Sequence, residues 1–466
     1  MNVAGSPAVA PPIIPRAAHD AAVAELVHHY RDLPPDARVR LGKKTSNLFR
    51  FGAAPAQRLD TSAFTGVIDV DPVARTAQVQ GMATYEHLVE VTLAHGLMPL
   101  VVPQLKTITL GGAVTGLGIE SSSFRHGLPH ESVREMDVLV PSGEVLTIRP
   151  EGAHADLFHG FANSYATLGY ALRLEIDLQP VASHVRLEHR RVPTGELAQA
   201  IRDACTLVPG EGYDFVDGVV FSRDEQYLTC ATFTDDPGPV SDYTGQQVFY
   251  RSVRERTVDH LTVHDYLWRW DTDWFWCSAA LGAQHPLVRR VWPGRYRRSD
   301  VYRRIVALDR RTRFSSRIRG LLRQPQEEPV IQDVEIPVER LPEFLDAFHR
   351  ELGIEPVWLC PLRLRGHEDG TGRTWPLYPM NTAQLYVNVG FWSTVPELPG
   401  DPEGHNRRIE ELVAQLGGHK SLYSTVHYDE PEFWEHYNGP AYRRLKERYD
   451  PDGRLPDLYS KVTGRA

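Results

Sequence analysis

Apolar and polar residues alternate along several short stretches in the first part of the chain, and this alternation predicts β-strands. The segment "VIDVDPVARTAQVQ" (67–80) contains two such stretches around a turn, and "VREMDVLVPSGEVLTIRP" (133–150) contains two more, so each predicts a hairpin. "ALRLEIDLQP" (171–180) alternates throughout and predicts a longer strand. "TYEHLVEVTLAHG" (84–96) instead has the spacing of an amphipathic helix that ends at a glycine.

After Pro180 the pattern predicts another set of elements. "FVDGVVF" and "YLTCATF" indicate a hairpin, and residues from "PVIQDVEIPV" to "SLYSTVHY" indicate the order β-α-β-β-α-β. That order is typical of a split βαβ unit. No sequence repeat is visible. Strands and helices mix without regular βαβ alternation, so the fold class is predicted to be α+β. We expect a leader at 1–20, a first domain at 21–180, a cap domain at 181–435 and a returning C-terminal segment at 436–466.

Composition places the chain among ordinary globular proteins, with 42% hydrophobic and 24% charged residues in 466. Its four cysteines are scattered without a C-x-x-C pair, so neither a metal site nor a disulfide framework is predicted, which suits a reducing cytoplasm. The proline-broken start lacks a basic region and favours a flexible leader over a signal peptide. No apolar run approaches the ~20 residues that span a bilayer, so we expect a soluble or peripheral protein.

The net charge of −9 hides one strongly basic segment. Residues 289–323 carry thirteen arginines and two aspartates, about +11, while the rest of the chain sums to about −20. Arginines three or four apart with nearby aromatic residues favour a segment that lies on an anionic membrane surface. A self-paired solvated surface is the plain alternative. Nucleic-acid binding is disfavoured because no reader motif accompanies the arginines.

Four closely spaced glycines stand in "TLGGAVTGLGIESSSFRHG" (109–127). Bare backbone of this kind can approach a phosphate group. The segment lacks the Lys-Ser/Thr that ends a P-loop, and Ser121 occupies the position of the third glycine of a dinucleotide fingerprint. The segment therefore fits neither of the two familiar phosphate-binding glycine loops well.

The flanks of this segment, "GLMPLVVPQLKTITLGGAVTGLGIESSSFRHG", resemble the flavin-binding domain of the vanillyl-alcohol oxidase / p-cresol methylhydroxylase superfamily. The resemblance continues through "ATLGYALRLEI", "IQDVEIP", "VWLCP" and "PEFWEHYNGPAYRRLKERY", and it covers the chain from about residue 40 to the end. Within the superfamily it is similar to the delta-24 sterol reductase branch. The resemblance implies a PCMH-type FAD-binding domain with an α/β cap.

The resemblance also implies which residues bind FAD. Two loops would meet at the pyrophosphate, one near "GKKTSN" and one at the glycine segment, with backbone N–H groups holding the phosphates and serines bonding phosphate or ring atoms. The implied residues are Lys44, Thr45, Ser46, Asn47, Pro103, Leu105, Thr109, Gly111, Gly112, Gly116, Gly118, Ile119, Ser121, Ser122, Gly127, Gly169 and Ile176. Relatives that tether flavin covalently use a histidine or a cysteine in these loops. This chain has neither there, so non-covalent FAD is expected.

The same resemblance implies reduction of an unactivated carbon–carbon double bond in a lipid, with NADPH as hydride donor. "PQLKTITLGGAVTGLGIES" and "DYLWRWDTDWFWCS" are similar to actinobacterial reductases that convert a 10-methylene fatty acyl chain to the 10-methyl form. A methyltransferase would then be a partner, and the enzyme would be cytoplasmic at the inner face of the membrane. The alternatives are a delta-24 sterol reductase, an oxidase of a small alcohol, and a lipid-binding protein without flavin.

An alkene reductase needs a proton donor opposite the flavin. The aromatic segment "HDYLWRWDTDWFWCS" (264–278) offers candidates, although for any one of its acids the favoured interpretation is a core helix with packed tryptophans and capping or ion-paired acids. The predicted catalytic residues are Tyr266, His264, Asp271 and Asn388, with Asp265 and Asp273 as further candidates. The predicted substrate or NADPH contacts are Arg363, Arg365 and Tyr386.

Overall fold

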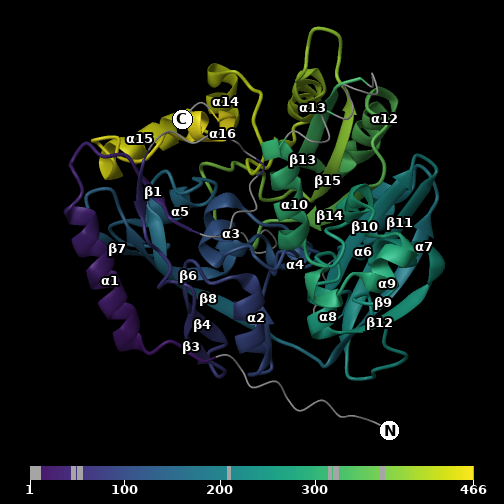
Figure 1. Ribbon diagram of the computed structural model, residues 1–466, viewed down its shortest axis with the longest axis horizontal. Helices are drawn as coiled ribbons and strands as arrows, with labels where there is room; N and C mark the ends of the chain where they lie inside the picture. Colours follow the sequence, from purple (N-terminus) through teal and green to yellow (C-terminus); the bar gives the residue numbers. More distant parts are fainter. Residues whose placement is uncertain are drawn as a thin grey trace.

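The computed structural model describes residues 12–43, 49, 56–206, 211–312, 317, 325–366 and 373–464. Two antiparallel sheets organise them, one formed by the strands between residues 67 and 180 and one by the strands between residues 184 and 420 (Figure 1). The predicted α+β class and two-domain architecture are confirmed. Since β8 ends at Pro180 and β9 begins at His184, the change of sheet falls where the sequence pattern changes.

The first sheet has the strand order β3-β4-β8-β6-β7, and β5 pairs with the far end of β8. Both predicted hairpins are present as the antiparallel pairs β3–β4 and β6–β7. The strands are β3 (Val67–Asp71), β4 (Thr76–Gln80), β5 (Leu97–Pro99), β6 (Val133–Leu139), β7 (Val145–Ile148) and β8 (Tyr170–Pro180). The helices between them are α2 (Tyr85–Leu93), α3 (Leu110–Gly116), α4 (Ser123–His126) and α5 (Ala155–Phe161).

Regular structure begins before the end of the predicted leader at residue 20. Helix α1 (Arg16–Arg31) begins directly after Pro15 and buries Leu26 and Tyr30 against the first domain. The Ile14 N–H also donates to the Val67 carbonyl at 2.8 Å. The leader boundary at residue 20 is therefore too late, because proline suits a helix start and the helix buries its own apolar side chains. Two short parallel strands, β1 (Val39–Leu41) and β2 (Gln57–Leu59), follow.

The cap sheet contains two split βαβ units rather than the one that the sequence indicates. Its strand order is β12-β9-β11-β10-β14-β15-β13-β16, so both units place their strands in the spatial order 4-1-3-2. The units join through β10 and β14, which pair antiparallel. The first unit is β9 (His184–Val192), α6 (Leu197–Ala204), β10 (Phe215–Ser222), β11 (Glu225–Thr234), α7 (Phe249–Glu255) and β12 (Val258–Thr262). The second is β13 (Glu327–Pro337), α12 (Leu341–Glu351), β14 (Val357–Leu362), β15 (Tyr386–Pro396), α13 (Gly404–Gln415) and β16 (His419–Lys420).

The strand predicted over "SLYSTVHY" (421–428) is wrong. Only β16, just before it, pairs with β13, and the Ser421 N–H makes a last bond to the Asp333 carbonyl. The chain then leaves the sheet, and Ser424 bridges to Phe49 of the first domain. Contacts with a distant segment thus replace the local strand preference at this position.

The two faces of the cap sheet pack against different partners. Alternate residues of β13, including Val330 and Val334, pack under α6, α12 and α13, while Asp333 and Glu335 belong to the opposite face. Apolar residues of both domains meet in a second core on that side. The helices between the two units are α8 (Val263–Leu267), α9 (Pro286–Val291) and α10 (Ser299–Thr312).

The C-terminal segment, yellow in Figure 1, lies over the first domain as α14 (Glu430–His436), α15 (Gly439–Tyr449) and α16 (Leu458–Thr463). The Lys446 ammonium group donates to the Thr167 carbonyl, and Lys461 donates to the Tyr165 carbonyl. Among the described residues, no helix combines the length and apolar character needed to cross a bilayer.

Candidate active site

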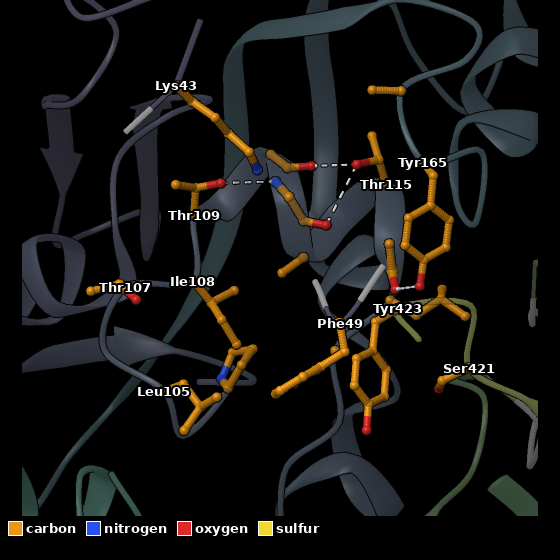
Figure 2. Close-up of a pocket in the computed structure, with 18 of the residues that line it drawn as sticks. Lys43, Phe49, Leu105, Thr107, Ile108, Thr109, Thr115, Tyr165, Ser421 and Tyr423 are labelled. Carbon is orange, nitrogen blue, oxygen red and sulfur yellow. Dashed lines mark hydrogen bonds between the residues drawn. The ribbon is translucent and has the colours of Figure 1, made fainter. Parts of the chain in front are cut away.

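A cavity of about 460 Å³ lies between the glycine helix α3 and the inner face of the cap sheet (Figure 2). Side chains from both sheets, from the aromatic segment and from the C-terminal helices line it. The glycine helix contributes Gly111, Gly112 and Gly116. Because the cavity lies between the domains and has both polar and apolar surfaces, it is the natural candidate for a ligand site.

The start of α3 uses its own backbone N–H groups. Thr109 caps the helix by accepting a hydrogen bond from the Gly112 N–H at 3.2 Å, as Figure 2 shows. The Leu110 and Gly111 N–H groups donate to the carbonyls of Ala83 and Gly81, each at 2.9 Å. The expectation that N–H groups at the start of this helix hold phosphate is therefore wrong for these three. The glycines here allow other groups to approach the backbone closely, and their N–H groups are not available as donors to a phosphate.

The glycines differ in what prevents a side chain. A Cβ on Gly111 would lie 2.7 Å from the Gly81 carbonyl oxygen, and one on Gly118 would press on Pro103 at 2.9 Å, so packing within the protein requires both. A Cβ on Gly112 would meet only the rotatable Oγ1 of Thr109. Since Gly112 lines the cavity, its missing side chain leaves space for a ligand.

Strained backbone is concentrated around this cavity. Eight non-glycine residues in the described part of the chain have positive φ, and five of them line the cavity. These five are Leu117, Tyr165, Ala166, Trp274 and Phe275. Two consecutive aromatic residues with φ of 46° and 58° are costly, and such strain persists mainly where function requires a fixed side-chain position.

One part of the cavity is basic. Arg38, Arg40, Lys43 and Lys461 line it, and in Figure 2 the Lys43 side chain extends toward the glycine helix. The predicted first loop, Lys44–Asn47, lies outside the described residues, but its neighbours Lys43 and Phe49 both line the cavity. Four cations near bare backbone suit a dianionic ligand group such as a pyrophosphate.

The opposite part of the cavity is aromatic. Phe49 stacks on Trp274 with ring centroids 5.9 Å apart and an interplanar angle of 12°. The ring centroids of Phe275 and Trp392 lie 4.4 Å apart, and the Trp392 indole N–H donates to the Tyr423 hydroxyl at 2.9 Å. These rings form a large and firmly held apolar surface.

A small polar group interrupts the aromatic wall. Asp333 on β13 and Asn388 on β15 both line the cavity, and the Asn388 Nδ2 donates to the Asp333 carboxylate at 3.0 Å. The Asn388 Oδ1 is buried with no hydrogen-bond partner in the protein, so it is available to a donor on a ligand. Sequence reasoning missed Asp333. The available signal was an acid in "VIQDVEIP", a stretch predicted to be a strand.

Comparison with known proteins indicates which cofactor this cavity accommodates. Residues 11–149 match the family described as "FAD binding domain". The chain is similar to Delta(24)-sterol reductase of Homo sapiens, 24% identical over 412 residues, which cover 85% of this chain and 76% of the relative. The protein is an FAD-dependent oxidoreductase.

Two plant proteins extend the comparison. The oxidoreductase is 25% identical to Delta(24)-sterol reductase of Arabidopsis thaliana over 439 residues, 86% of this chain and 76% of the relative. It is also 29% identical to Cytokinin dehydrogenase 10 of Oryza sativa subsp. japonica, but over only 157 residues, 33% of this chain and 28% of that one. The similarity to the sterol reductases thus extends through the cap, whereas the similarity to the dehydrogenase covers a third of the chain.

The structure divides the predicted FAD contacts of this oxidoreductase into two groups. Those that line the cavity are Pro103, Leu105, Thr109, Gly111, Gly112, Gly116, Gly118 and Ile119. Those that lie away from its lining are Ser121, Ser122, Gly127, Gly169 and Ile176. The Ser122 hydroxyl donates to the Leu100 carbonyl, and the Ser121 hydroxyl bonds Glu120 and Tyr266, so neither is free for a phosphate.

Three predicted catalytic side chains also lie away from the cavity lining. Tyr266 is buried, its hydroxyl bonds Ser121 at 3.0 Å, and burial raises its pKa well above the usual value. His264 is half-exposed beside Asp265. Asp271 is buried and accepts hydrogen bonds from Lys106 and Ser299. These three side chains therefore have the structural roles that the alternative interpretation of the aromatic segment predicts. Of the four predicted catalytic residues, only Asn388 lines the cavity.

The predicted substrate or NADPH contacts are likewise held by the protein. Arg365 forms an ion pair with Asp177 at 3.0 Å and donates to the Glu131 carbonyl, which links cap and first domain. The Tyr386 hydroxyl accepts the Asn381 N–H. The Arg363 backbone N–H donates to the Ser123 carbonyl at 3.3 Å. None of the three lines the cavity.

Proposed function

We propose that this oxidoreductase reduces an isolated carbon–carbon double bond in a lipid and that NADPH supplies the hydride. The preferred substrate is a phospholipid-bound 10-methylene fatty acyl chain, which becomes the 10-methyl chain. The observation that carries the proposal is the composition of the cavity. An aromatic wall suited to hydrocarbon faces the glycine helix, and among the described lining residues a single carboxyl group interrupts that wall.

The cavity residues suit FAD. When bound, FAD supplies hydride-transfer chemistry at its ring system. Arg38, Arg40, Lys43 and Lys461 would neutralise the pyrophosphate, and the open side of Gly112 would admit the cofactor. None of the described residues that line the cavity is a histidine or a cysteine, which supports non-covalent binding.

The aromatic rings would serve an alkene in two ways. Their apolar faces would hold the hydrocarbon chain, and their negative faces would stabilise positive charge that develops when the alkene is protonated. Trp274 and Phe275 are fixed for this role by their unusual backbone conformation. The 10-methylene substrate would come from an enzyme that adds a one-carbon unit to an unsaturated chain, so a methyltransferase is the expected partner.

A delta-24 sterol is the second candidate substrate. The specific observation in its favour is the name of the relatives, Delta(24)-sterol reductase, whose similarity extends over both domains. A sterol side chain also ends in an isolated alkene, so the same cavity chemistry applies. The two candidates differ in shape and not in reaction class.

The test separates the two half-reactions in purified, FAD-loaded protein. NADPH is expected to bleach the visible flavin absorbance under anaerobic conditions, and vesicles of 10-methylene acyl phospholipid should then restore it. Delta-24 sterol vesicles, saturated phospholipid and a small alcohol are the parallel samples. Bleaching by the alcohol instead of NADPH would indicate an oxidase. Restoration by the sterol alone would select the second candidate, and protein that never retains FAD would refute both.

We further propose that α9 and α10 contact the inner face of the cell membrane and place the enzyme in the cytoplasm at that surface. Leu287, Val291 and Leu308 are 69%, 78% and 61% exposed. Arginines 290, 295, 304 and 311 of the same part of the chain are also exposed. Exposed apolar side chains among arginines suit an anionic bilayer, where each basic residue contributes ~1 kcal/mol. The buried Arg289 and Arg297 do not take part, because they bond backbone carbonyls of residues 244–247.

The triple variant Leu287→Glu/Val291→Glu/Leu308→Glu is expected to bind anionic phospholipid vesicles at least about tenfold more weakly, because it removes apolar contacts and adds repulsion. Vesicle co-sedimentation measures the effect. Val73→Glu is the matched control, since Val73 is 94% exposed on the first domain. Equal binding by the triple variant and the control would contradict the membrane assignment.

A further inference from the structure

Asp333 has a special position in the cavity. It is the single carboxyl group among the described residues that form the lining. It belongs to the face of β13 opposite the one that packs under the cap helices, as its neighbours Val330 and Val334 show by belonging to the helix-side core. Burying an acidic group on a wall of tryptophan and phenylalanine costs free energy. A group kept there despite this cost points to a function.

The surroundings of Asp333 hold its carboxyl group in one place. The Asn388 amide donates to it at 3.0 Å, and the Tyr423 hydroxyl forms a second side-chain hydrogen bond. Gly390 lies directly opposite on β15, and any Cβ there would collide with the carboxyl oxygen. Glycine at position 390 therefore leaves the space that the Asp333 carboxyl group occupies.

A second acid lies behind Asp333 on the same strand face. Glu335 is fully buried and accepts hydrogen bonds from the Tyr378 hydroxyl and, at 2.9 Å, from the Ser421 hydroxyl. Ser421 itself lines the cavity. Burial raises the pKa of Asp333 to about 6 and that of Glu335 to about 8, although the ammonium group of Lys420 acts against the shift at Asp333. Glu335 is therefore largely protonated at neutral pH, whereas Asp333 changes its protonation state about one pH unit below neutrality.

We infer that Asp333 is the acid that protonates the double bond, and that Asn388 and Tyr423 position it; this inference rests on the proposed function. The π electrons of the C=C bond take the Asp333 proton, so an O–H bond breaks and a C–H bond forms at the methylene carbon. The branched carbon receives the hydride that NADPH ultimately supplies. The Asp333 carboxylate then regains a proton from solvent, with Glu335 and Ser421 as the nearest buried source. One alkene, one NADPH and one proton are consumed for each reduced chain.

The test compares Asp333→Asn with wild type in the FAD-loaded protein. Reduction by NADPH should stay within about threefold, while reoxidation by the alkene should slow at least about a hundredfold, within the range that proton transfer contributes. In wild type the alkene step should lose rate as pH rises through about 6, because only the protonated acid donates. Burial raises this midpoint, while the hydrogen bonds from Asn388 and Tyr423 and the charge of Lys420 lower it; Glu335 lies on the same strand face. Asp333→Glu should recover part of the rate.

Asp259→Asn is the matched control, because Asp259 is a buried acid away from the cavity lining and should leave both half-reactions unchanged. If Asp333→Asn slows both half-reactions equally, or neither, the assignment is overturned. A separate readout uses no substrate. The infrared difference spectrum of wild type minus Asp333→Asn should contain the band of one protonated carboxyl group below pH 6, and this band should disappear as the pH rises through about 6. If no alkene reoxidises wild type, the proposed function fails, and the infrared titration alone then decides whether Asp333 stores a proton.

Discussion

Replacement of Arg269 by methionine is expected to lower the free energy of unfolding by about 3–5 kcal/mol, because it removes one partner of a fully buried ion pair. The Arg269 guanidinium donates to Asp217 at 2.8 Å and lies 3.6 Å from Glu120. Its Nη1 also donates to the Tyr266 carbonyl at 2.9 Å. Without Arg269, the Asp217 carboxylate stays buried with only two indole N–H donors. Urea denaturation followed by tryptophan fluorescence measures the loss.

The same replacement should also weaken FAD retention. Glu120 follows directly after Ile119, which lines the cavity, so Arg269 ties the end of the glycine segment to the cap. Arg340→Met is the matched control, because Arg340 pairs with Glu343 on an exposed surface and should cost less than about 1 kcal/mol. In a double-mutant cycle, Asp217→Asn should cost clearly less in the Arg269→Met background than in wild type. Additive effects would show that Arg269 and Asp217 do not interact energetically.

Gly112→Val is expected to abolish FAD retention while the chain stays folded. A branched side chain would enter the cavity at the glycine helix, where only the Thr109 hydroxyl lies near the new Cβ. We expect the dissociation constant for FAD to rise at least about a hundredfold, equivalent to ~2.7 kcal/mol. The flavin content of purified protein and titration of the apoprotein with FAD measure it.

Gly111→Val provides the contrast. Its Cβ would press against the Gly81 backbone, so this variant should lose stability itself and lose FAD only as a consequence. Gly112→Ala should fall between wild type and Gly112→Val in FAD affinity. If Gly112→Val retains flavin normally, the cofactor does not pass along the exposed side of this glycine. If Gly112→Val unfolds like Gly111→Val, the two glycines have the same structural role.

Local pattern predicted much of the framework. The hairpins at β3–β4 and β6–β7, the strand β8 and the helix–strand order of the second split unit all follow from periodicity within ten to twenty residues. The same pattern did not reveal that the cap repeats this unit. A repeated topology depends on which strands pair, and strands of unlike sequence can pair in the same order.

The candidate site was only partly predictable for the same reason. The glycine segment carried its own signal, and eight of the predicted contacts within or just before it line the cavity. The choice of Tyr266 and Asp271 as acids followed from their position in a conspicuous aromatic run. Folding instead buries both among partners from distant segments, such as Ser121 and Ser299. Arg289 and Arg297 were counted as surface charge, yet they hold backbone carbonyls inside the cap.

The sequence by itself determined the fold class, the hairpins of the first domain and the segment that gives the cavity its bare backbone, because each depends on residues close together in the chain. The tertiary structure alone decided which acid faces the cavity and which cations surround the phosphate end. Asp333 and Asn388 come from two strands of the second split unit, Tyr423 follows its last strand, and Lys461 comes from the last helix. Their proximity results from strand pairing and domain packing over hundreds of residues, which no local pattern encodes.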